Sequence, residues 1–102
     1  MSQYSVCPII TATSDMDNYG LNGYSYFPTD CSAGNITVTL PTSVWDGLCY
    51  IFNRTDSSAN VLTLDAHTGT VAGGSSITIG PKTYVEAVFL NGDWMIPRIT
   101  YT

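Results

Sequence analysis

Apolar and polar residues alternate along several short stretches of the chain. In NITVTLP, Ile36, Val38 and Leu40 share one side of an extended backbone, and polar residues separate them. This period of two is typical of a β-strand with one buried face, and Pro41 ends the strand. The stretch SITIGP at 76–81 alternates in the same way. Both stretches are therefore predicted to be half-buried strands.

Two other stretches, LCYIFN at 48–53 and TYVEAVFL at 83–90, are apolar on both sides. In the second stretch, one side carries Val85, Ala87 and Phe89, and the other carries Tyr84, Val88 and Leu90. A domain of this size has a single thin core. The second side is therefore expected to meet either another layer of the same chain or another subunit.

The dipeptide Asn91-Gly92 lies between two apolar runs near the end of the chain. Both residues accept the positive φ of a type I′ turn, so a β-hairpin is predicted there. No segment has a convincing helical period. Further strands, two of them short, are predicted at 61–66, 24–27 and 70–71.

These patterns predict an all-β fold, a compact antiparallel β-sandwich or small barrel of about six to eight short strands. Residues 1–14 are predicted to form an arm or an edge strand, because Pro8 is tolerated at the edge of a sheet. Residues 15–102 are predicted to form a single β domain, and no internal repeat is visible.

The overall charge narrows the functions to consider. The chain has 102 residues, of which 11% are charged, and its net charge is −5. Its three basic residues are Arg54, Lys82 and Arg98, which argues against binding to nucleic acid or to an anionic membrane. No apolar run reaches the length of a membrane span, and the first residues lack the pattern of a signal peptide. We therefore expect the chain to fold where it is made.

The cysteines fit an intracellular place of folding. Cys7, Cys31 and Cys49 are odd in number and have no CxxC spacing, which argues against a disulfide framework and a zinc site. They are expected to be free, mostly buried thiols in a reducing compartment.

Candidates for catalysis and metal binding are few. His67 is the single histidine and lies near Asp65 and Ser76, but no GxSxG motif accompanies it. We therefore expect a loop histidine and no enzyme, with a small hydrolase as a remote alternative. The stretch DMDNYG lacks the ligands of an EF-hand, because Tyr19 and Tyr26 occupy two ligand positions. An Asx-rich turn is expected there, a loose calcium site at Asp15, Asp17 and Asn18 is the alternative, and no cofactor or metal is predicted.

Two groups of residues are candidates for binding. Tyr19, Tyr24, Tyr26 and Asp30 could form a ligand or receptor loop, because tyrosine rings stack on sugars and Asp accepts hydroxyl hydrogen bonds. The same tyrosines could instead anchor a protein interface or pack the loop onto the sheet.

The second group is predicted to contact another subunit or a capsid: Tyr84, Val88, Leu90 and Trp45. Trp45 and Trp94 also lie at strand borders, where tryptophan is expected to pack into the core.

The order NITVTLP, then GLCYIFNRTDSSANVLTLDA, then GTVAGGSSITIGPKTYVEAVFLNGDWMI resembles a β-rich module of fibre and head-associated proteins of bacteriophages and large viruses. The likeness covers residues 13–97 and consists of the ITVTLP strand, a Y-x-F-x-N strand, the SITIGP strand and a final hairpin ending in G-x-W. The chain departs from the module in the tyrosine-rich stretch YGLNGYSYFPTDCS and in its three cysteines.

This resemblance implies a homotrimeric structural role on a virion surface, after assembly in the host cytoplasm. The expected function is a non-enzymatic phage virion protein, either a capsid decoration or cement protein or a head-fibre component. Its expected partners are major capsid or fibre proteins. The alternative is a tail-fibre or receptor-binding tip that recognises a host glycan.

Overall fold

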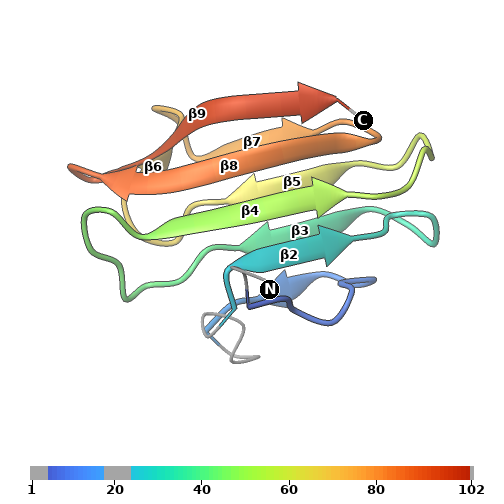
Figure 1. Cartoon of the computed structure of the whole chain (residues 1–102), viewed down its shortest axis with the longest axis horizontal. Coiled ribbons are helices and arrows are strands. Elements are labelled where there is room, and N and C mark those ends of the chain that lie inside the picture. Colours follow the sequence, from blue (N-terminus) through green and yellow to red (C-terminus); the bar gives the residue numbers. More distant parts are fainter. Residues whose placement is uncertain (1–4, 18–23, 102) are drawn as a thin grey trace.

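The computed structural model describes residues 5–17 and 24–101, and for residues 98, 100 and 101 it describes the backbone alone. The regular secondary structure of this part of the chain consists entirely of β-strands (Figure 1). They are β1 (Ser14–Asp15), β2 (Tyr26–Thr29), β3 (Ile36–Thr39), β4 (Cys49–Arg54), β5 (Leu62–Asp65), β6 (Thr70–Val71), β7 (Ser76–Ile79), β8 (Thr83–Leu90) and β9 (Asp93–Tyr101). The prediction of an all-β fold is therefore confirmed.

The strands form two mixed sheets, and the chain passes from one sheet to the other at nearly every step. One sheet has the order β1-β3-β5-β7 and the other the order β2-β4-β8-β9-β6. Figure 1 shows β2, β4 and β8 in front of β3, β5 and β7. Neighbours β1, β3 and β5 are parallel, as are β2 and β4.

The fold is thus a short β-solenoid, and the prediction of an antiparallel sandwich or barrel is wrong. Parallel neighbours need a long crossover, and here the strand in the opposite sheet supplies it. The later strands reverse direction, since β7 is antiparallel to β5 and β8 is antiparallel to both β4 and β9.

The coil contains a structural repeat that the sequence did not reveal. Ser14 pairs with Val38 and Val38 with Leu64, so equivalent positions lie 24 and 26 residues apart. The repeated signal is short, because ITVT of β3 aligns with LTLD of β5 over four residues, and the first coil contributes only the polar pair Ser14 and Asp15. The expectation of no internal repeat is therefore wrong for the structure.

Residues 5–10 run along the free edge of β2. Val6 forms a bridge with Tyr26 and Ile10 with Thr29, both parallel. The N–H groups of Cys7 and Ile10 donate to β2, whereas Pro8 between them has no N–H to offer. Cys7 and Ile10 are buried, so this segment closes one end of the core.

The core lies between the two sheets, where equivalent positions of successive coils stack. Phe27, Phe52 and Val85 form one such row in the five-stranded sheet. The rings of Phe27 and Phe52 are stacked with centroids 5.1 Å apart, and those of Tyr50 and Trp94 are stacked at 5.5 Å. Burying each of these aromatic side chains contributes roughly 2 kcal/mol to folding.

The hairpin of β8 and β9 forms as the sequence predicts. Asn91 and Gly92 have φ values of 54° and 84°, which confirms a turn with two positive φ angles. Val85, Ala87 and Phe89 are buried, which confirms that this side of β8 faces the core.

Arg54 lies at the end of β4 and is 1% exposed, and its guanidinium donates hydrogen bonds to three separate parts of the chain. Its Nε donates to Asp56 Oδ1 at 3.0 Å, its Nη1 to the carbonyl of Ile79 at 2.8 Å and its Nη2 to the carbonyl of Asn60 at 2.6 Å. The Asp56 carboxylate also accepts from the N–H groups of Cys31 and Ser58. The guanidinium holds the pKa of Asp56 well below its usual range.

Gly69 should not tolerate a side chain. Its φ is 73°, and a Cβ there would overlap the carbonyl oxygen of Gly92. We expect Gly69→Ala to lower the melting temperature by more than about 5 °C, from left-handed strain and the displaced hairpin turn. Gly34→Ala is the matched control, because nothing lies within 4 Å of its Cβ position and its φ is not positive. Equal melting temperatures for the two variants would contradict the close approach.

Asp56→Asn should destabilise the protein by about 3 kcal/mol at neutral pH, because it leaves the Arg54 charge buried without a counter-ion. The low pKa of Asp56 means that its stabilisation is complete above its unfolded pKa of about 4 and is lost as the pH falls below that value. Urea unfolding from pH 7 to pH 3 should therefore show a shallower acid loss for Asp56→Asn than for the parent. A parallel loss in both proteins would refute the ion pair as a source of this pH dependence.

Candidate interaction surface

The outer face of the five-stranded sheet carries the residues that alternate with the core positions. The register aligns Ile51 with Glu86, and Asn53 with Tyr84. It also aligns Cys49 with Val88, and Val88 with Met95. These residues therefore form cross-strand rows on the side of the sheet that faces away from the core.

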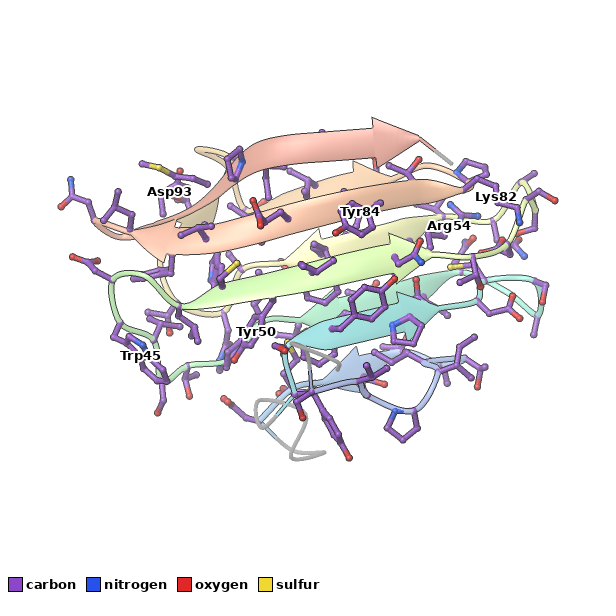
Figure 2. The ribbon with its side chains drawn as sticks, in the orientation of Figure 1. Trp45, Tyr50, Arg54, Lys82, Tyr84 and Asp93 are labelled. Atoms are coloured by element: carbon purple, nitrogen blue, oxygen red, sulfur yellow. The ribbon has the colours of Figure 1, made fainter. Side chains whose placement is uncertain are left out.

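One end of this outer face is apolar. We define the apolar patch as Cys49, Val88, Leu90 and Met95. Cys49 is exposed, Val88 is half-buried, and Leu90 and Met95 are 44% and 42% exposed. The patch brings together Val88 and Leu90, two of the predicted contact residues, beside the Asn91-Gly92 turn. Tyr84 lies further along the same face and is half-buried (Figure 2).

Carboxylates stand beside the apolar patch. Asp46 Oδ1 accepts from the N–H of Asn91 at 2.9 Å. Asp93 Oδ1 accepts from Thr70 Oγ1 at 2.6 Å and from the N–H of Gly73 at 3.0 Å. These hydrogen bonds, with Thr70 first, lower the pKa of Asp93 from its ordinary value, so the carboxylate keeps its charge in mild acid.

Trp45 is not a core residue, because its side chain is 62% exposed. It precedes β4 in a loop that is held to the hairpin by Gly47 N–H donating to the carbonyl of Phe89 at 2.8 Å. Figure 2 shows Trp45 and Asp93 at one end of the molecule and Lys82 at the other. Trp94, in contrast, is fully buried as expected, and Met95 points outward.

A polar aromatic cluster occupies the outer face beyond the apolar patch. Asn53 Nδ2 donates to the hydroxyl of Tyr26 at 2.8 Å. The rings of Tyr26 and Tyr84 are tilted by 58° with centroids 6.5 Å apart. The sequence did not predict Asn53 or Tyr84 as a partner of Tyr26. The alternation of CYIFN nevertheless places Asn53 on the side of the strand that faces away from the core.

The predicted ligand loop is not one site in the structure. Tyr24 packs against the core, and Tyr26 starts β2 with its side chain on the outer face. Asp30 lies past the other end of β2, where its Oδ1 accepts from the N–H of Ser32. A strand therefore separates Asp30 from the two tyrosines, and Tyr19 lies outside the described residues.

His67 lies beside Asp17, with Nδ1 at 3.9 Å from Oδ2. The Asp17 carboxylate also accepts hydrogen bonds from the hydroxyl of Thr42 at 2.6 Å and from the N–H of Thr42. These bonds lower the pKa of Asp17. Asp15 Oδ1 accepts from the N–H of Asp17, which confirms an Asx turn there.

Asn18, one residue of the alternative calcium site, lies outside the described residues. The other two, Asp15 and Asp17, accept hydrogen bonds from backbone N–H groups. Within residues 5–17 and 24–101 there is no group of three or more metal-ligating side chains. That part of the chain also forms no helix that is long and apolar enough to cross a bilayer.

Cys49 is the exposed thiol of the three cysteines, whereas Cys7 and Cys31 are buried. Its Sγ lies 3.9 Å from Oε2 of Glu86 on the neighbouring strand. Partial burial raises the pKa of Cys49, and the negative charge of Glu86 raises it further. Cys49 is therefore a natural reporter for the apolar patch.

We expect a maleimide to modify Cys49 in the folded protein, while Cys7 and Cys31 react only on unfolding. Glu86→Gln should speed the reaction several-fold near pH 8, because removal of the carboxylate charge lowers the thiol pKa and raises the thiolate fraction. The measurement is the modification rate against pH, with intact mass spectrometry. A matched control is Glu86→Asp, which keeps the charge and should react at nearly the parent rate. Reaction of a buried cysteine first would contradict the burial described here.

Comparison with models of known protein families finds no match for the chain, and comparison with curated protein sequences finds none either.

Proposed function

We propose that the chain is a non-enzymatic structural protein of a bacteriophage virion, a capsid decoration or cement protein or a head-fibre component. The proposal starts from the likeness of its strand order to viral fibre and head modules. The single observation that carries it is the apolar patch on the outer face of the five-stranded sheet. Large side chains such as Leu90 and Met95 are exposed there without any role in the core.

Rigidity of the surroundings supports a docking role. Three hydrogen bonds hold the hairpin that carries Leu90. Asp46 accepts from the N–H of Asn91 in the turn, and Thr70 donates to Asp93 on β9. The N–H of Gly47 donates to the carbonyl of Phe89 on β8. A surface that is already ordered loses little conformational entropy when it binds, so a small apolar area can give useful affinity. Trp45 stands at the same end of the molecule and adds a large aromatic anchor.

Other virion proteins, either major capsid or fibre proteins, are the proposed partners, and the virion surface is the proposed location. A homotrimer remains part of the proposal through the viral resemblance. Light scattering of the purified protein measures it directly, and a monomer at all concentrations would remove the trimer without touching the docking role.

A tail-fibre or receptor-binding tip is the second candidate, and the polar aromatic cluster favours it. Tyr26, Asn53 and Tyr84 combine two rings with an amide on an outer face, a combination that can stack on a sugar and bind its hydroxyls. Glycan-array binding that is lost in Tyr84→Ala and kept in Trp45→Ala would favour this candidate over decoration.

Quantitative mass spectrometry of purified virus particles whose genome encodes this chain tests the proposal. We expect many copies per particle, as a protein that decorates the shell requires, and we expect Cys49 to be protected from maleimide in intact particles. A few copies per particle would support the fibre or tip role instead. Absence from the particles would refute the virion proposal.

A further inference from the structure

We propose that the apolar patch binds an aliphatic segment flanked by lysine or arginine on a different protein, and not a second copy of this chain. This inference rests on the proposed docking role and adds the chemistry of the partner. It follows from the charges that stand around the patch.

The centre of the patch selects aliphatic side chains. Val88 and Met95 face outward from adjacent strands, and Leu90 extends the same side of β8 to the turn. These residues lie side by side on adjacent strands, so a partner gains contact by laying side chains across the strands. Covering this patch is favourable because it removes exposed apolar surface from water.

The flanks of the patch select positive charge. Asp46 and Asp93 lie at the hairpin end, and Glu86 lies on the other flank beside Cys49. A basic side chain of a partner could reach any of these carboxylates while its aliphatic neighbours cover Leu90. Exposed ion pairs add little each, but together they choose between partners of opposite charge.

A second copy cannot supply that charge well. The chain carries −5 overall and has three basic residues. Arg54 is buried against Asp56, and Lys82 lies at the end of the molecule opposite to Trp45 and Asp93 (Figure 2). Arg98 aligns with Glu86 of its own hairpin. Two patches placed face to face would therefore bring together surfaces on which three carboxylates, Asp46, Glu86 and Asp93, outnumber Arg98, the basic residue aligned with Glu86.

The free edges of the five-stranded sheet offer no better contact. Residues 5–10 border the sheet on one side and contain Pro8, and β9 borders much of the other side and contains Pro97. Proline lacks the N–H that strand addition needs, and edge prolines protect sheets against pairing with other chains. The outer face of this sheet is consequently a better surface for docking than these two edges.

Three synthetic peptides provide the probe, with Cys49 as the reporter. One has alternating leucines flanked by lysines, the second has the same leucines flanked by glutamates, and the third keeps the lysines and replaces leucine by serine. We expect the lysine–leucine peptide to slow maleimide modification of Cys49 several-fold at low salt, and the other two to leave the rate nearly unchanged. Higher salt should weaken the protection.

Two sets of variants locate the binding. Leu90→Ser with Met95→Ser should abolish the protection, whereas Val61→Ser, at a position 42% exposed outside the patch, should keep it. Asp46→Asn with Glu86→Gln should weaken binding about 3- to 10-fold, measured as peptide concentration for half protection relative to each variant's own unprotected rate. The amide oxygen that Asp46→Asn introduces can still accept the N–H of Asn91, so the hairpin should fold normally.

Three outcomes would overturn the inference. Equal protection by the lysine and glutamate peptides, or none by either at any soluble concentration, would remove the preference for a basic partner. Protection that rises with protein concentration alone, together with a larger mass in light scattering, would show that the occupant is a second copy. None of these outcomes bears on the copy number in particles, so the virion proposal would fail or survive separately.

Discussion

Stacking of side chains from successive coils is the constraint on which the rest of this structure depends. Each coil contributes one short strand to each sheet, and a strand of four residues is too short to be stable alone. It becomes stable because its inward residues, such as Phe52, lie directly over those of the coil before and the coil after. The alternation between sheets, the parallel pairing and the position of the outer face all follow from this stacking.

The sequence predicted local structure well, because strands and tight turns depend on neighbouring residues. The alternation of Ile36, Val38 and Leu40 and the pair Asn91-Gly92 each encode their own geometry. Topology was predicted wrongly, because it depends on which strand pairs with which. An alternating strand pairs equally well with a parallel or an antiparallel neighbour, and nothing local in ITVT names LTLD as its partner.

The candidate surface was predicted in part for the same reason. Alternation along β8 places Tyr84, Val88 and Leu90 on one side, so these three outward-facing residues could be assigned from one strand. Met95 and Cys49 join them only through the register with β9 and β4, and their presence required the structure. Trp45 illustrates the limit of composition, since a tryptophan between strands is usually buried and this one is exposed.

The repeat of 24 and 26 residues has a consequence for how such a protein changes over evolution. An added or deleted segment of one full coil would change the height of the molecule while leaving the register of its core rows intact. A smaller insertion would have to lie in a loop between strands, because an insertion inside a strand would shift its register. The two additional residues between Val38 and Leu64 therefore belong to loops. The length of such a fold therefore changes by whole coils, and the hairpin of β8 and β9 can keep its structure in a relative with more or fewer coils.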